Sequence, residues 1–374
     1  MRVYHPGNTI ARFSLRYPYI FCNRNRKHLL FGICAPKTCV MLAGPRANSI
    51  LFGHKAAEGV VAEAIASGRM HHAWLITGPV GIGKATFAYR FARRLLGDEQ
   101  LDPANPVARR IAAGAHADLF VLQRTVSPST KKLRGEIVVE DVRAAGEFLR
   151  LTPAEGGWRV VIVDRADELN RSAANALLKI LEEPPGRAVL LLVAASPGRL
   201  PATVRSRCRR LALRPLPEDA MGKLLAQALP DMAEEERLRL ASLAEGSPGR
   251  ALRLAAEEGI AMAGLVDEVL AALPELGAAR MHEVVDRLGR SDQGFSTFFE
   301  LLRAAISAAV RDAARGQADA EQGRIAALRP LAEWGDVWHA LSRLQDETEA
   351  FALDKRQAVI QGLSLLTDRV PIVA

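Results

Sequence analysis

The sequence predicts an α/β core with a parallel sheet, followed by two regions that are entirely helical. Short runs rich in valine, leucine and isoleucine, at residues 160–163 and 188–195, lack polar alternation, which is typical of strands buried on both faces of a parallel sheet. Helical patterns separate such runs, as in doubly wound folds. After the segment Pro215-Leu216-Pro217 no strand pattern follows, so the sheet is expected to end there.

Composition and charge limit the classes of protein to which the chain can belong. Its 374 residues allow two or three domains, and 49% hydrophobic with only 5% aromatic residues is typical of a helix-rich globular protein. No apolar run is long enough to span a bilayer, so we predict a cytoplasmic protein without a membrane segment. Nine basic and no acidic residues precede Glu58. The remainder is therefore nearly neutral, and the net charge of +8 does not by itself indicate DNA binding.

Residues 1–46 differ from the rest of the chain. They are basic, hold three of the four cysteines (Cys22, Cys34 and Cys39) and show no helical or strand period. A targeting peptide, a disordered tail and translation from an upstream start codon all fit this composition. We favour the last two interpretations and expect no function from this segment. The cysteines form no CxxC pair, which disfavours disulfides and a zinc site and fits a reducing cytosol.

The predicted elements of the core alternate in type. In order, they are a helix at 57–67, a strand at 75–77, a helix to about residue 96, a strand at 119–123, a polar loop at 124–134, a helix at 139–150, a strand at 160–163, a helix at 170–183 and a strand at 188–195. Asn170 or Ser172 can cap the last of these helices, and two prolines end it. Its apolar stripe consists of Ala174, Leu177, Leu178 and Leu181.

The remaining chain is predicted to be helical throughout. Three short helices are expected at 218–229, 234–244 and 249–258. In the last hundred residues Phe298, Leu302, Ile306 and Val310 recur every four positions, which predicts one apolar helix face.

A glycine-rich loop follows the first predicted strand and precedes a helix. Its pattern, Gly78-x₄-Gly83-Lys84, is that of a phosphate-binding loop, in which backbone amides cradle phosphates and the lysine reaches them. The next position needs a hydroxyl for Mg²⁺ but holds Ala85, with Thr86 one place late and rotated by about 100° on a helix. The candidate nucleotide-binding residues are Gly78, Gly81, Gly83, Lys84, Thr86 and Asp164. Nucleotide binding and a relic loop kept for packing both remain open.

The segment from Val160, "VVIVDRADELNRSAANALLKILEEPP", and the later Ser206-Arg207-Cys208 resemble the clamp-loader branch of the AAA+ ATPases. Within that branch they look most like the delta-prime subunits of bacterial DNA polymerase III. The resemblance is specific over about fifty residues and weaker over residues 50–374. It implies an AAA+ α/β P-loop core at 47–214, a small helical lid at 215–260 and an all-α collar at 261–374 that joins five subunits into a ring.

Three departures from this family bear on ATP hydrolysis. Active AAA+ subunits place a glutamate base directly after the aspartate equivalent to Asp164, whereas this chain has Arg165. We interpret the following Asp167 and Glu168 as solvated helix-entry acids. In the lid, Gly249 stands where motor subunits carry an arginine, and we interpret the displaced Arg250 as a surface residue. The resemblance therefore implies no hydrolysis by this chain alone.

The Ser206-Arg207-Cys208 triplet, in contrast, matches the family completely. In clamp loaders its arginine reaches a neighbour's ATP as an arginine finger. The alternative is a generic surface arginine, because Arg207 lies in a basic run. The complete triplet at the matching distance after the "LEEPP" helix favours the finger.

The sequence therefore predicts a non-catalytic stator subunit of the DNA polymerase III clamp loader, which helps to load the sliding clamp onto primed DNA. The implied partners are motor subunits of the gamma/tau type, the delta subunit, the sliding clamp and primer-template DNA. ATP or ADP could be bound without hydrolysis. Many delta-prime proteins carry a four-cysteine zinc module, but the matching residues 96–118 contain no cysteine, so no zinc is expected. The alternatives are an ATP-hydrolysing motor of the gamma/tau type or a related AAA+ ATPase and, less favoured, a stand-alone DNA-binding protein.

Two smaller features have simple interpretations. His71 and His72 are adjacent in an expected strand, where neighbouring side chains face opposite ways, so packing and capping are favoured over metal binding. Lys131, Lys132 and Arg134 are interpreted as a solvated loop rather than a DNA contact.

Overall fold

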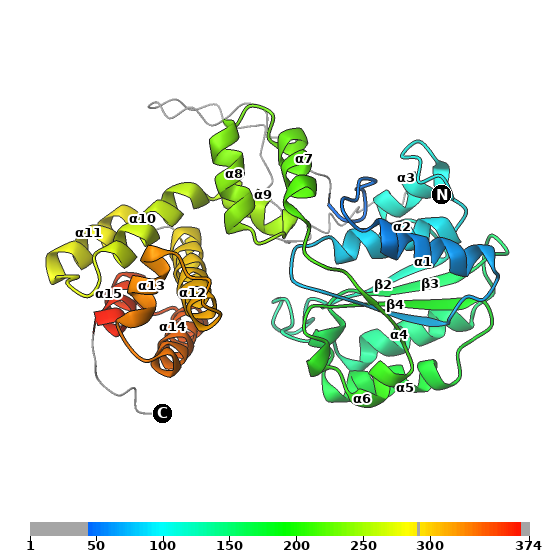
Figure 1. Cartoon of the computed structure of the whole chain (residues 1–374). Helices are drawn as coiled ribbons and strands as arrows, with labels where there is room; N and C mark the ends of the chain where they lie inside the picture. The colour runs from blue at the N-terminus through cyan, green and yellow to red at the C-terminus, as the bar shows by residue number, and fades with distance from the viewer. Residues whose placement is uncertain (1–43, 290–291, 368–374) are drawn as a thin grey trace, which may run out of the picture. The chain divides into compact units, whose positions relative to one another are not determined.

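The computed structural model describes residues 44–289 and 292–367 (Figure 1). Within them lies one five-stranded sheet of order β2-β3-β4-β1-β5, and all neighbouring strands in it are parallel. The strands are β1 (Ala73–Thr77), β2 (Leu119–Leu122), β3 (Arg159–Val163), β4 (Ala188–Ala194) and β5 (Arg209–Ala212). The α/β core with a parallel sheet is therefore confirmed.

Helices cover both faces of this sheet (Figure 1). On one face lie α1 (Lys55–Ala66), α2 (Lys84–Leu95) and α3 (Pro106–Ala113). On the other lie α4 (Val139–Arg150), α5 (Arg171–Glu182) and α6 (Ala202–Ser206). Every residue of β3 and β4 is buried, because alternate side chains of a strand point to opposite faces and both faces are covered. Double burial explains the lack of polar alternation in these runs.

Helix α5 forms as its sequence predicts. The side chain of Asn170 accepts a hydrogen bond from the N–H of Ala173 at 2.9 Å, so Asn170 rather than Ser172 is the N-cap. Ala174, Leu177 and Leu181 of the predicted stripe are buried in the core. Leu178 packs against the same cluster from a less buried position. The helix ends one residue earlier than predicted, at Glu182.

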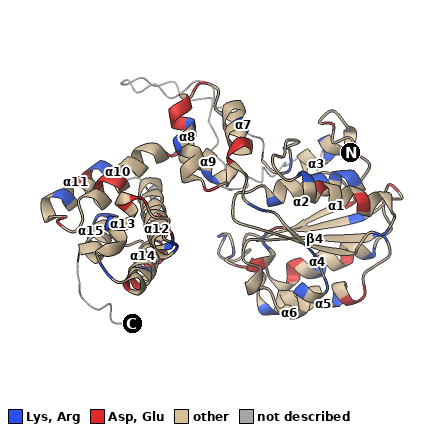
Figure 2. Ribbon diagram, in the orientation of Figure 1, with Lys and Arg blue, Asp and Glu red and all other residues tan. Residues whose placement is uncertain are grey.

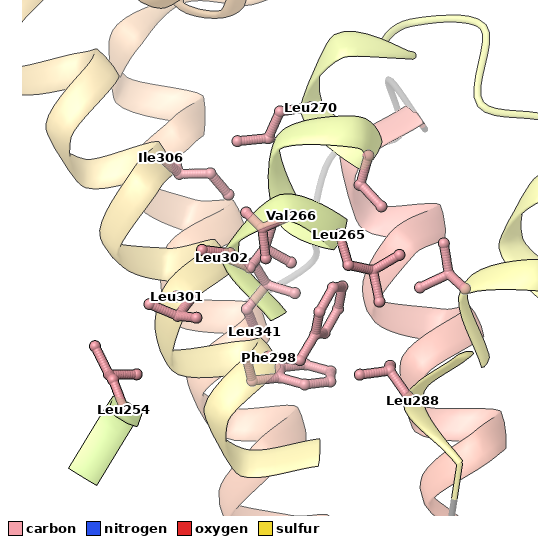
Figure 3. Close-up of a cluster of buried hydrophobic side chains, with 14 of the residues drawn as sticks. Leu254, Leu265, Val266, Leu270, Leu288, Phe298, Leu301, Leu302, Ile306 and Leu341 are labelled. Atoms are coloured by element: carbon pink, nitrogen blue, oxygen red, sulfur yellow. The ribbon is translucent and has the colours of Figure 1, made fainter. Parts of the chain in front are cut away.

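The chain beyond the sheet is helical. The first three helices are α7 (Glu218–Ala228), α8 (Glu234–Leu243) and α9 (Pro248–Ala256). They are followed by α10 (Gly259–Ala271), α11 (Ala278–Leu288), α12 (Asp292–Ala314), α13 (Ala320–Ala327), α14 (Leu331–Phe351) and α15 (Lys355–Thr367). Side chains from α7 to α15 join a single apolar cluster, part of which Figure 3 shows. Phe298, Leu302 and Ile306 of α12 are buried in it, which confirms the predicted apolar face.

Several elements were not predicted. They are the short helices α3 and α6 and the strand β5. The predicted polar loop is a small hairpin, because Val126 and Leu133 form an antiparallel bridge and the N–H of Ser127 donates to the Lys132 carbonyl at 2.9 Å. The exposed Lys131 and Lys132 lie on this hairpin.

The structure describes only the last three residues of the predicted N-terminal extension. Most of that extension, residues 1–43, lies outside the described part of the chain. Residues 44–46, which we assigned to it, contact the core, because the carbonyl of Arg46 accepts a hydrogen bond from Arg93 of α2 at 3.1 Å. In the described ranges, no helix combines the length and the apolar character that crossing a membrane requires.

Candidate functional site

The phosphate-binding motif forms the connection between β1 and α2. Its glycines Gly78, Gly81 and Gly83 have φ angles of 145°, 81° and 99°, which side-chain-bearing residues rarely adopt. A Cβ at Gly78 would also lie 2.4 Å from the carbonyl oxygen of Leu213. The glycines are therefore required by the backbone path of the loop, and the loop leads into the N-terminus of α2, where anions are favoured.

Lys84, the motif's lysine, is turned back onto the loop. Its side chain is largely buried, and Nζ donates hydrogen bonds to the carbonyls of Gly78 at 2.7 Å and Pro79 at 2.6 Å. Burial lowers the pKa of Lys84 to about 8, although the carboxylates of Asp167 and Asp164 act in the opposite direction. The ammonium group must exchange these carbonyls for phosphate oxygens before it can serve a nucleotide.

Residues of the predicted lid supply the next two contacts along the same loop. The hydroxyl of Ser247 donates to the carbonyl of Val80 at 2.9 Å, and the N–H of Gly249 donates to the carbonyl of Gly81 at 2.9 Å. The following carbonyl, that of Ile82, is 2.8 Å from Nε2 of His54. Five consecutive loop carbonyls, at residues 78–82, therefore have partners within the protein.

Gly249, where the resemblance places a lid arginine in motor subunits, lies directly on the loop. A Cβ added there would be 3.0 Å from both the Cα and the carbonyl oxygen of Gly81. Arg250 points to other partners: its Nη1 donates to Glu245 at 3.1 Å, and its Nε lies 3.0 Å from a carboxylate oxygen of Glu300 in α12. With 16% of its side chain exposed, Arg250 is not the surface residue that we predicted, because Glu245 and Glu300 hold it between the predicted lid and α12.

The residues around the loop do not fit an ordinary Mg²⁺ site. Ala85 has no hydroxyl, and Thr86 is buried in α2. Asp164 follows the end of β3, and burial raises the pKa of its carboxyl group. The glycines and Lys84 thus retain a phosphate-binding pattern, whereas the groups for the metal are incomplete.

No carboxylate directly follows Asp164. Arg165 adopts a left-handed backbone conformation with φ 59°, and 52% of its side chain is exposed. It pairs with Glu168 at 2.9 Å. The residue beside Asp164 is therefore a cation that is already paired, and it cannot accept a proton from a water molecule.

The two acids that follow are structural, so our interpretation of them as solvated was wrong. Asp167 accepts a hydrogen bond from the N–H of Ser196 at 2.8 Å, just after β4. Glu168 also pairs with Arg124, just after β2, at 2.9 Å. Both carboxylates fasten the turn after β3 to the ends of neighbouring strands, which parallel strands bring to one edge of the sheet.

The Ser206-Arg207-Cys208 triplet closes the short helix α6. The hydroxyl of Ser206 donates to the carbonyl of Thr203 at 3.0 Å. The thiol of Cys208 is buried, and burial raises its pKa to about 11, so it stays protonated at neutral pH. Both flanking side chains therefore serve the local fold.

Arg207 reaches beyond its own helix. Its Nη1 donates to the carbonyl of Thr203 at 3.0 Å, and its Nη2 lies 2.7 Å from Oε1 of Glu182 at the end of α5. The side chain remains 37% exposed. Arg209 of the same basic run lies instead over the ring of Trp74, at 4.7 Å from its centroid. The run is thus not a uniform set of solvated arginines.

The distribution of charge and the positions of two histidines bear on DNA binding and on metal binding. Basic and acidic residues are interspersed over the described elements (Figure 2), which agrees with the near neutrality of the chain after residue 57.

His71 and His72 precede β1, and their rings stack at 4.5 Å, so our prediction that they face opposite ways was wrong. The described residues contain no group of three or more His, Cys, Asp or Glu side chains that could hold a metal ion.

The sequence is similar to those of known DNA polymerase III subunits. Residues 53–217 match the family model of the DNA polymerase III delta subunit. The chain is 41% identical to DNA polymerase III subunit delta' of Pseudomonas aeruginosa over 191 residues, and 36% identical to that of Escherichia coli over 192. Over the aligned residues the chain is similar to the delta-prime subunits of DNA polymerase III. These alignments cover 49% and 50% of the chain, and 55% of each delta-prime protein, so the chain spans about half the length of these relatives.

Motor-type relatives are more distant. DNA polymerase III subunit tau of E. coli is 32% identical over 219 residues, which cover 56% of this chain and 32% of tau. A solved gamma-subunit-related protein of Thermotoga maritima overlaps with 84% of this chain and 99% of its own at 17% identity and a TM-score of 0.42, too low a likeness to carry an argument. Identity thus favours the delta-prime group over the gamma and tau group.

Sequence reasoning missed three residues of this region. They are Ser247 and Glu300, which form the lid contacts, and Glu182, which holds Arg207. Glu182 stands within the family-like "LEEPP" word, which was the one available signal. The other two contacts join residues that are far apart in sequence, and no local pattern indicates them.

Proposed function

We propose that this chain is the delta-prime-like stator of a bacterial DNA polymerase III clamp loader. It would act in a ring with gamma/tau-type motor subunits and a delta subunit, which together load the sliding clamp onto primer-template DNA. One observation carries the proposal: Arg207 is partly exposed at the end of α6, while the chain's own loop lacks a metal-binding hydroxyl and a base. The chain would thus assist ATP hydrolysis at the site of a neighbouring subunit and would not hydrolyse ATP itself.

Arg207 is the residue that we assign to chemistry. A guanidinium placed against the γ-phosphate of a neighbour's ATP stabilises the negative charge that spreads over the phosphoryl oxygens in the transition state. Its planar fork of N–H donors suits this task better than the point charge of a lysine. The helices after residue 260 would serve as the collar that holds the subunits together, and any ATP or ADP in this chain's own loop would stay unhydrolysed.

A second candidate is a motor subunit of the gamma/tau type. The 32% identity to tau of E. coli supports it. Three positions oppose it: Ala85 lacks the metal-binding hydroxyl, Arg165 replaces the base, and Gly249 lies against Gly81 where a motor would carry its lid arginine. Hydrolysis of ATP by the purified chain alone would favour this candidate.

The test is the DNA-stimulated ATPase rate of motor and delta subunits reconstituted with this chain. With Arg207→Ala we expect ATP hydrolysis to be lost at the served site, which is the neighbouring subunit's ATP site that Arg207 would complete. Arginine fingers contribute about 10³–10⁵-fold to the rate at such a site. Arg210→Ala, in the same basic run and exposed, is the matched control and should leave the rate unchanged. An unchanged rate with Arg207→Ala in a fully assembled complex would contradict the finger.

A further inference from the structure

The C-terminal end of α5 carries an unusual charge. Glu182 is its last residue and Glu183 its C-cap, at the end of a helix where the dipole favours cations over carboxylates. The two prolines that follow prevent the helix from extending past them. A carboxylate held at this end gains from a nearby cation, and Arg207, the C-cap residue of α6, provides one at 2.7 Å from Glu182.

Two acceptors from two different elements determine where the guanidinium of Arg207 lies. Nη1 bonds to the carbonyl of Thr203 within α6, and Nη2 contacts Glu182 of α5. Contacts on two nitrogens fix the plane of a guanidinium as well as its position. An arginine has five N–H donors, and the side chain is still 37% exposed, so donors remain for an incoming phosphate.

Glu182 rests on a rigid support. Leu181, which directly precedes Glu182, and Leu177, just over one turn earlier on α5, are buried against the sheet. The carboxylate therefore projects from an element whose position is set by the core. The pair is also nearly half exposed, with 48% of the Glu182 side chain accessible, and such pairs are weak and screened by salt. Glu182 can thus orient the arginine without holding it too tightly for it to meet a second anion.

We propose that Glu182 is a positioning residue for Arg207, which holds the guanidinium in place before it meets a neighbour's ATP. This inference rests on the proposed function of Arg207 as a finger. A side chain ordered in advance loses less conformational freedom on forming the transition state, and small displacements of a charged group from its target are costly. Glu182 would act through Arg207 alone and touch no part of the nucleotide.

The experiment uses the reconstituted clamp loader and four forms of this chain besides wild type. Glu182→Gln keeps the shape and removes the charge. Glu183→Gln, its exposed neighbour, is the matched control. Arg207→Ala shows how much of the ATPase rate depends on the served site. The double variant of Arg207→Ala with Glu182→Gln tests whether the two residues act together. Thermal unfolding of each variant and assembly by size-exclusion chromatography separate misfolding from misplacement.

We expect Glu182→Gln to lower the kcat of the served site by about 3- to 10-fold with KM for ATP unchanged, because only the transition state uses the finger. Glu183→Gln should match wild type. The double variant should be no slower than Arg207→Ala, since a positioning residue has nothing to act on once the arginine is gone. A merely structural role for Glu182 would add to the defect of Arg207→Ala instead.

The other outcomes overturn the inference in distinguishable ways. If Arg207→Ala lowers the rate but Glu182→Gln does not, the positioning role is wrong and the finger stands. If Glu182→Gln raises the rate, Glu182 restrains the arginine, which also contradicts positioning. If Arg207→Ala itself leaves the rate unchanged in assembled complexes, both the proposed function and this inference are wrong.

Discussion

The N–H of Gly249 donates a hydrogen bond of 2.9 Å to the carbonyl of Gly81, and this contact joins the lid to the phosphate-binding loop. Ser247 makes a parallel bond to the preceding carbonyl at 2.9 Å. Both partners lie at the start of α9, so the beginning of that helix is fastened to the loop. The predicted lid thus makes a structural contact at the position where the family resemblance places an arginine in motor subunits.

The first prediction concerns the backbone of that contact. Gly81→Ala should lower the free energy of unfolding, because the added Cβ would lie 2.4 Å from the Ser247 hydroxyl and because φ is 81° at this position. A residue other than glycine held in a disfavoured conformation costs about 1–3 kcal/mol, so a loss of at least that size is expected in urea denaturation.

Gly222→Ala is the control for this prediction. Gly222 lies within α7, and a Cβ there would meet nothing within 4 Å. Since alanine is preferred over glycine inside helices by about 0.5–1 kcal/mol, this variant should be more stable than wild type. Equal stabilities of Gly81→Ala and wild type would show that the lid contact does not constrain the loop.

The second prediction concerns the pH dependence of stability. The pKa of Lys84 is lowered from its ordinary 10.5 to about 8 in the folded chain, mainly by burial. Between these two values the unfolded chain binds more protons than the folded chain at this residue, so the contribution of Lys84 to stability rises as the pH rises from about 8 to about 10.5. Below pH 8 the contribution is constant, at its least favourable value.

Lys84→Met isolates this effect. The difference in unfolding free energy between wild type and the variant should move in favour of wild type across that pH window. Its slope should not exceed about 1.4 kcal/mol per pH unit, the limit for one proton. A difference that stays flat from pH 7 to 10.5 would mean that burial does not lower the pKa of Lys84.

The fold could be predicted from local patterns, whereas much of the site could not. Runs such as that at β3 are apolar because both of their faces are buried, and that property is written in the sequence itself. The partners of Arg250 and Arg207 are different: Glu300 and Glu182 lie 50 and 25 residues away from them and meet them only in the folded chain. Asp167 was misjudged for the same reason, since its partners belong to the end of another strand.

The third prediction concerns the ionic contact between α9 and α12. Glu300 lies 3.0 Å from Arg250 and 2.6 Å from Arg253, and its side chain is 31% exposed. Glu300→Gln should lower the free energy of unfolding by about 1–2 kcal/mol, because the hydrogen bonds from Arg253 lose their charged acceptor and because both arginines lose the negative charge that they share. The loss should shrink at high salt, since the group is not fully buried.

Asp267→Asn provides the comparison, because Asp267 also pairs with an arginine, Arg239, but with both side chains about half exposed. Such surface pairs contribute about 0–1 kcal/mol, so this variant should stay closer to wild type at every salt concentration. In addition, hydrogen exchange of the amides in α9 should quicken in Glu300→Gln and not in Asp267→Asn, because only the former releases that helix from α12. Unchanged exchange in α9 would show that the Glu300 contact does not hold that helix to α12.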